Sequence, residues 1–133
     1  MKKQAIELHD STLGSIERRG GVSVIHLNPA YLHIWDDDIG PKVGEGWLQL
    51  IDVIVQDGQS LHRREDYEVR IADGLLRTES GVHNNVIPLP LESTRPCLIR
   101  LALADGRDIA IEGSGLTIEL RGEAKYLESY DWR

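Results

Sequence analysis

The sequence predicts an all-β protein, and three observations lead to this prediction. Apolar and polar residues alternate along most of the chain, glycines and Asp-Gly pairs interrupt the alternation at short intervals, and no long window has the helical spacing of apolar residues. The interrupted segments amount to about eight to ten short strands. We therefore expect a mostly antiparallel two-sheet sandwich or flattened barrel, with at most a short helix near the C-terminus, at residues 123–130.

The length, net charge and cysteine content of the chain limit the classes of protein to which it can belong. The 133 residues suit one domain spanning 1–133. A formal net charge of -7 disfavours nucleic acid or an anionic membrane surface as a partner, and it is compatible with a basic protein. Cys97 is the only cysteine, so no internal disulfide forms, and no apolar run approaches the ~18 residues of a membrane helix. We expect a cytoplasmic protein.

The two segments on either side of Asn28-Pro29 are predicted to form a hairpin. Asn28-Pro29 suits the first two positions of a type I turn, so residues 28–31 are expected to form a four-residue loop. Leu27 then faces Leu32, and His26 faces His33. A shift of one residue would mix apolar with polar side chains on both faces, which favours this register.

Two further hairpins are predicted from Asp-Gly turns. Asp73-Gly74 is expected to turn the chain between two strands. Residues 98–112 form the clearest hairpin, with a three-residue loop at 104–106. That loop sets Leu101 against Ile109, so that the large apolar residues share one face.

A metal site is one hypothesis that follows from the predicted 28–31 hairpin. Cross-strand neighbours have Cβ atoms about 5 Å apart, so His26 and His33 would be close enough to share a divalent metal. A carboxylate from Asp36, its two aspartate neighbours or Asp10 would complete the ligand set. The alternative is that both histidines lie on a solvated polar face, in which case the protein has no cofactor.

Aromatic residues suggest surfaces for binding. Trp35 and Tyr31, together with Trp47, would make a stacking platform for a sugar if they are exposed on one sheet face, whereas Trp47 alternatively anchors the core. The C-terminal stretch is also aromatic, with Tyr130 and Trp132 near its end. Such a cluster either docks on a partner or packs on its own fold.

The N-terminal segment carries a resemblance to a group of bacterial proteins. His9-Asp10-Ser11, followed by Leu13 and Ile16, resembles the start of small uncharacterised bacterial proteins that have a short strand, an H-D-S or H-D-A turn and a second strand. Some of these proteins are associated with immunity to secreted toxins. The resemblance implies a bacterial all-β protein, covers about twenty residues and transfers no functional residue.

Catalytic motifs are lacking, so we expect a binding domain rather than an enzyme. His9, Asp10 and Ser11 have the residue types of a hydrolase triad, but adjacent residues on a strand point to opposite faces. The leading hypothesis is an immunity-like domain that acts by protein–protein contact, with His9, Asp10, Tyr31 and Trp35 as candidate partner-binding residues. The alternatives are a metal-binding barrel or metal-dependent enzyme, and a carbohydrate-binding sandwich. A homodimer through exposed sheet edges also stays open.

Overall fold

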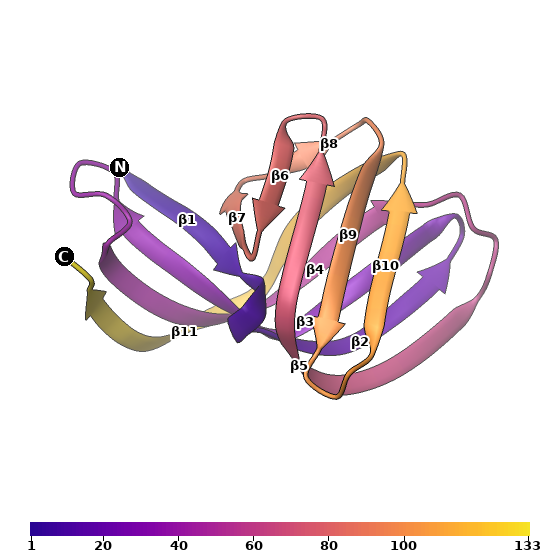
Figure 1. Ribbon diagram of the computed structural model, residues 1–133, viewed down its shortest axis with the longest axis horizontal. Coiled ribbons are helices and arrows are strands. Elements are labelled where there is room, and N and C mark those ends of the chain that lie inside the picture. Colours follow the sequence, from indigo (N-terminus) through magenta and orange to yellow (C-terminus); the bar gives the residue numbers. More distant parts are fainter.

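Strands make up nearly all of the ordered elements. The computed structural model describes residues 1–133, of which 74% lie in strands and essentially none in helices (Figure 1). None of its helical segments has the length and apolar character needed to cross a membrane. The elements are β1 (Lys2–Glu7), η1 (Leu8–Asp10), β2 (Thr12–Arg19), β3 (Val22–Asp36), β4 (Val43–Gln56), β5 (Arg63–Thr78), β6 (Gly81–Asn84), β7 (Val86–Leu89), β8 (Glu92–Ser93), β9 (Cys97–Leu103), β10 (Asp108–Gly113) and β11 (Gly115–Asp131).

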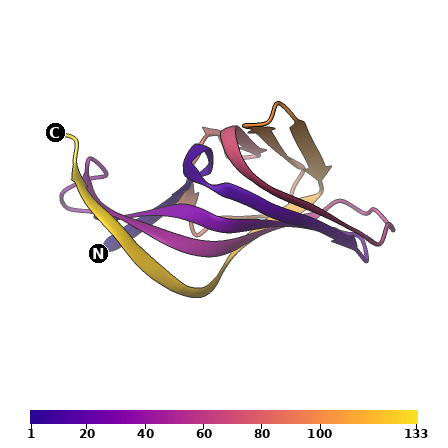
Figure 2. The ribbon, with the colours of Figure 1, turned by 90° about the horizontal axis from the view of Figure 1, so that it is seen from below.

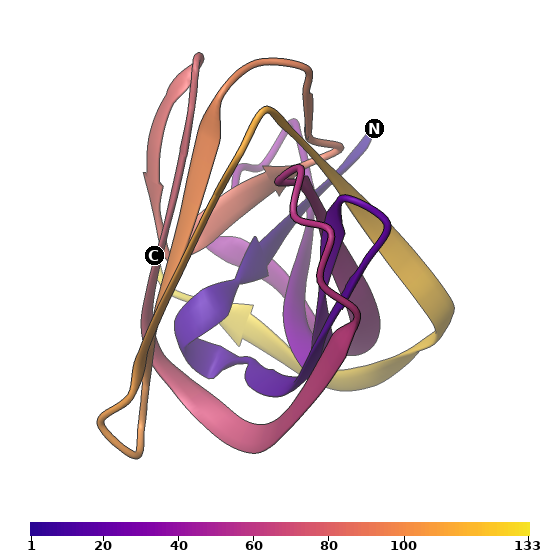
Figure 3. The ribbon, with the colours of Figure 1, turned by 90° about the vertical axis from the view of Figure 1, so that its right-hand side faces the viewer.

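The strands form one antiparallel sheet that folds back over itself. Its order is β10-β9-β5-β2-β3-β4-β11-β8, while β1 pairs with β3 and β7, and β6 pairs with β5. The first part of β5 pairs with β2 and the second part with β9, with a register shift between Ile71 and Asp73. β5 thereby carries the sheet from the layer of long strands to the layer of β6, β9 and β10 (Figures 2 and 3). The all-β prediction is confirmed, and the sheet does not close into a barrel.

The hydrophobic core joins side chains from both layers. Ile25 and Val53 come from the long strands, and Leu76, Ile99 and Leu101 come from the second layer. All five are at most 2% exposed. Because side chains alternate along each strand, the residues between the core positions lie on the opposite face of the sheet. That outer face carries the candidate sites described below.

The hairpin predicted at 98–112 is confirmed, including its register. Ile109 pairs with Leu101 and Ile111 pairs with Ile99. Gly106 lies in the left-handed region, with φ of 92°, and its N–H donates to Leu103 O at 3.0 Å. A three-residue loop with glycine in that conformation therefore connects β9 and β10, as the matching of apolar residues predicts.

The hairpin predicted at 28–31 is wrong, and so is the facing of His26 with His33. β3 runs without a turn from Val22 to Asp36 and pairs with β4 along almost its whole length. Asn28 and Pro29 lie in a bulge of this strand, a position that tolerates the missing N–H of proline. The longer strand gains ladders with β2 and β1 on its other edge, which a local hairpin would lack.

The turn predicted at Asp73-Gly74 is also wrong, and the segment 123–130, where at most a short helix was expected, is a strand. Gly74 lies inside β5, where a Cβ atom would lie 2.5 Å from Leu8 Cδ1. Its missing side chain thus admits Leu8 rather than forming a turn. The stretch 123–130 belongs to β11, which pairs with β4 through two register shifts. Those bulges disturb the alternation and imitate helical spacing.

Candidate functional site

An apolar hollow lies on the outer face of β1 and β3, beside the C-terminal end of β11. We call it the His33 hollow, and its volume is about 320 Å³. Apolar groups dominate its surface. Its lining consists of residues from β1, β3, β7, the loop before β4 and the C-terminus: Ala5, Glu7, His33, Trp35, Pro41, Lys42, Val86, Tyr130 and Trp132.

Two glycines of β4 lie beside the residues that surround the hollow. Gly44 pairs with Trp35 on one side and Tyr130 on the other, and Gly46 pairs with His33. A Cβ at Gly44 would lie 2.6 Å from Ile34 O and 2.8 Å from the Tyr130 hydroxyl, and one at Gly46 would lie 2.5 Å from Cζ of Tyr31. The absence of a side chain thus leaves room for the Tyr31 ring at Gly46, and for the Ile34 carbonyl and the Tyr130 hydroxyl at Gly44.

His33 is the centre of the polar contacts below the hollow. Its Nε2 donates to the carboxylate of Glu7, since an ionised carboxylate only accepts hydrogen bonds. In the neutral imidazole, Nδ1 then accepts from the hydroxyl of Tyr130, 3.3 Å away. The ring also contacts Tyr31 and Trp132, with centroids 4.7 and 5.8 Å apart. These contacts fix the imidazole and leave neither nitrogen free.

The two tyrosines beside His33 are held in their neutral forms. Burial raises the pKa of Tyr31, and the hydrogen bond that its hydroxyl donates to Glu128 at 2.8 Å raises this pKa further. Burial also raises the pKa of Tyr130, with a smaller contribution from the charge of Glu7. Both hydroxyls therefore act as donors to neighbouring acceptors.

Trp132 forms the outer rim of the hollow. Its backbone N–H donates to Lys42 O at 2.8 Å, which ties the C-terminus to the loop before β4. Its indole stacks on Tyr130 with a centroid distance of 4.1 Å and an interplanar angle of 18°. Even so, Trp132 is 59% exposed. An anchored and exposed indole at the edge of an apolar hollow is suited to contact a partner.

The structure brings together several of the residues singled out in the sequence. Tyr31, His33 and Trp35 alternate along β3 and all belong to the surroundings of the hollow. His9 reaches the same network from η1, because its Nε2 lies 2.9 Å from Glu7 Oε1. Asp10 lies next to His9, with its Oδ2 at 3.5 Å from His9 Nε2.

His26 and Asp36 do not join His33. His26 and His33 lie seven positions apart on one strand, which corresponds to about 23 Å at ~3.3 Å per residue. Asp36 is at the end of β3, where its Oδ1 accepts from the N–H of Asp38 at 3.0 Å. The metal site expected from these three residues therefore does not form, since its ligands depended on the 28–31 hairpin.

His26 belongs to a separate cluster of charged groups in a polar hollow of about 190 Å³. Its Nδ1 lies 2.6 Å from Asp52 Oδ1, and its Nε2 lies 3.1 Å from Glu17 Oε1. Arg121 Nε contacts the other oxygen of Asp52 at 2.9 Å. Each ring nitrogen has a carboxylate partner, so this histidine is part of an internally satisfied ion cluster.

Sequence reasoning did not identify Glu7, Gly44 or Gly46. Glu7 is contributed by β1, which pairs with β3 across a long sequence separation. The Gly-x-Gly spacing at 44–46, immediately before an apolar strand, is the one local signal of a close approach. Comparison with known proteins gives no match, since no family model, curated protein or solved structure is significantly similar to this chain.

Proposed function

We propose that this chain is a non-enzymatic binding protein that recognises a partner protein through the His33 hollow. The observation that carries the proposal is the hollow itself, which is preformed, mostly apolar and walled by Trp35, Tyr130 and Trp132. The polar side chains of Glu7, His33 and Tyr130 in its lining are hydrogen-bonded to one another. An apolar side chain of a partner can therefore enter without breaking these hydrogen bonds.

The charge of the chain favours a basic partner. The formal net charge of -7 would accelerate encounter with a basic protein and repel acidic ones. An apolar anchor residue surrounded by lysines and arginines is thus the partner surface that fits best. The resemblance of the N-terminal segment favours a bacterial immunity-like role in the cytoplasm, in which the partner is a secreted toxin.

The test compares the proteins retained by two variants of the C-terminal part of the chain. Trp132→Ala removes the rim of the hollow. Tyr126→Ala is a matched control, because Tyr126 is a 53% exposed aromatic residue of β11, the strand that leads to Trp132, and it lies outside the hollow. Bacterial lysate is passed at low salt over the immobilised wild-type protein and each variant. We expect the wild type and Tyr126→Ala to retain the same basic protein.

Trp132→Ala should weaken that complex by at least about 30-fold, the effect of losing a ~2 kcal/mol hot spot. Retention of the partner by Trp132→Ala at wild-type strength would overturn the proposal, and so would the absence of any retained protein. A change in tryptophan fluorescence on adding oligosaccharides, abolished in Trp132→Ala, would instead assign the hollow to sugar binding.

A further inference from the structure

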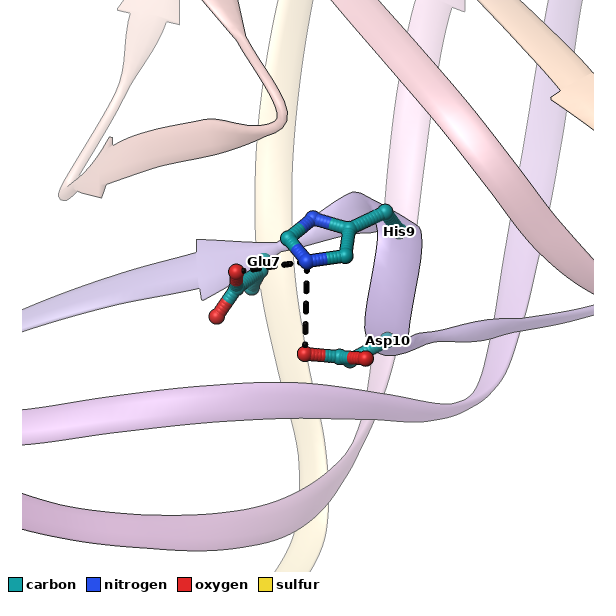
Figure 4. Close-up of side chains that lie close together, drawn as sticks. All are labelled: Glu7, His9 and Asp10. Carbon is teal, nitrogen blue, oxygen red and sulfur yellow. Dashed lines mark ion pairs between the residues drawn. The ribbon is translucent and has the colours of Figure 1, made fainter. Parts of the chain in front are cut away.

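A second group of side chains converges at the turn that follows β1. Glu7 ends the strand, and His9 and Asp10 lie on the 3-10 turn η1 (Figure 4). His9 Nε2 is 2.9 Å from Glu7 Oε1 and 3.5 Å from Asp10 Oδ2. All three ligand atoms lie within 4.8 Å of one another. One imidazole nitrogen and two carboxylate oxygens therefore surround a common point.

The backbone of this turn is fixed by the fold. The Ser11 hydroxyl donates to Glu7 O at 2.7 Å and accepts from the N–H of Tyr31 at 2.9 Å, which binds the turn to β3. Leu8 is completely buried and packs over Gly74 of β5. The ligand atoms are thus held in place before any ion binds, which lowers the cost of ordering them.

Outer contacts aim the two carboxylates toward His9. Glu7 Oε2 accepts from His33, which leaves Oε1 facing His9. Asp10 Oδ1 contacts Arg70 Nη2 at 3.2 Å, which leaves Oδ2 facing His9. This is how metal ligands are usually oriented, because a hydrogen-bond donor holds the oxygen that does not bind the ion.

We propose that Glu7, His9 and Asp10 form a binding site for a divalent transition metal, for which Zn²⁺ fits best. Zinc takes nitrogen and oxygen ligands at about 2.0–2.2 Å in tetrahedral geometry, so its ligands lie ~3.3 Å from one another. The separations of 2.9 and 3.5 Å bracket that value. His9 and Asp10 have side chains that are 39% and 35% exposed, which gives the ion a route of entry and leaves a position for water.

One proposed ligand, His9, lacks a hydrogen bond to the ring nitrogen that faces away from the ion. Nδ1 of His9 is buried and has no hydrogen-bond partner, although a metal-binding histidine usually donates its second N–H to an acceptor. We therefore expect an affinity about 10–100-fold weaker than that of a zinc site with complete outer contacts. The site shares Glu7 with the lining of the hollow, but His9 and Asp10 do not line it, so variants of these two residues leave the proposed partner-binding surface intact.

Calorimetric titration with ZnCl₂ tests this site on untagged, chelator-treated full-length protein. The wild type should bind one zinc ion per chain, reversibly with a chelator. His9→Ala should weaken binding by at least about tenfold, and Asp10→Asn should also weaken it. His62→Ala is the matched control, because it removes an exposed histidine outside the cluster and should bind like the wild type.

Circular dichroism of each variant checks that the fold is intact. Absence of saturable zinc binding by the wild type would overturn the proposal. Equal affinities of wild type and His9→Ala would also overturn it, since the ion would then be bound elsewhere. Neither result affects partner retention by the Trp132 and Tyr126 variants, so the two proposals fail separately.

Discussion

Replacing Gly46 by alanine tests how the His33 hollow is built. Gly46 is not among the glycines in the left-handed region, so the backbone of β4 accepts alanine without strain. The obstacle is Tyr31, because the added Cβ would lie 2.5 Å from Cζ and closer still to the hydroxyl. The phenol ring must therefore move away from β4.

The expected cost follows from what Tyr31 loses. Its hydroxyl gives up the hydrogen bond to Glu128, and a bond to a charged group contributes about 1.5–3 kcal/mol. Overpacking of the ring adds about 1–3 kcal/mol. Alanine also reduces the conformational entropy of the unfolded chain, which stabilises the folded state by about 0.4–1 kcal/mol. We expect Gly46→Ala to lower the free energy of unfolding by about 1.5–5.5 kcal/mol.

A double-mutant cycle with Tyr31→Ala measures this effect by urea denaturation. Without the ring there is no steric conflict, so Gly46→Ala in the Tyr31→Ala background should change the free energy of unfolding by less than ~1 kcal/mol. Equal destabilisation in both backgrounds would refute the reasoning, because the cost would then come from the backbone of β4 and not from the tyrosine.

Three further predictions concern the residues in and near the two proposed sites. Burial and Glu128 raise the pKa of Tyr31 above its ordinary 10.0, so the unfolded chain loses this proton first and stability falls as the pH rises above that value. In Tyr31→Phe, urea denaturation at alkaline pH should show a smaller fall, and an unchanged fall would contradict this assignment. Glu7→Leu should lower the free energy of unfolding by about 1–3 kcal/mol, because the buried Nε2–H of His33 loses the oxygen that accepts its hydrogen bond; a change near zero would mean that this hydrogen bond contributes nothing to stability. Gly74→Ala should lower the free energy of unfolding by about 1–3 kcal/mol, because the added methyl group clashes with Leu8. A variant as stable as the wild type would show that η1, which carries Leu8, moves aside without loss of stability.

Local patterns were sufficient to predict the class of fold and one hairpin in detail. The register of Leu101 with Ile109 follows from residues close in sequence, where loop length and apolar matching act together. Asn28-Pro29 and Asp73-Gly74 have equally strong turn composition, yet both lie inside strands. Pairing with distant strands outweighs the turn preference there, and no local window contains that information.

The same distinction applies to the site. His33 and Trp35 share a face because side chains alternate along one strand, and this much was predictable; Tyr31 joins them only because β3 continues through the segment 28–31 that was predicted as a loop. Glu7 reaches His33 only because β1 pairs with β3, and Tyr130 reaches it only because β11 pairs with β4. Contacts made across a sheet between distant segments decide which residues complete the hollow.

The central claim is that a partner protein binds at the His33 hollow, and the three tryptophans of the chain are natural reporters of it. Trp35 and Trp132 line the hollow, whereas Trp47 packs against Tyr126 elsewhere on the sheet. The measurement is the ¹H–¹⁵N spectrum of the indole groups during titration with the retained partner. We predict that the Trp35 and Trp132 signals shift while the Trp47 signal stays in place. A shift of Trp47 with Trp35 and Trp132 unchanged would contradict the account.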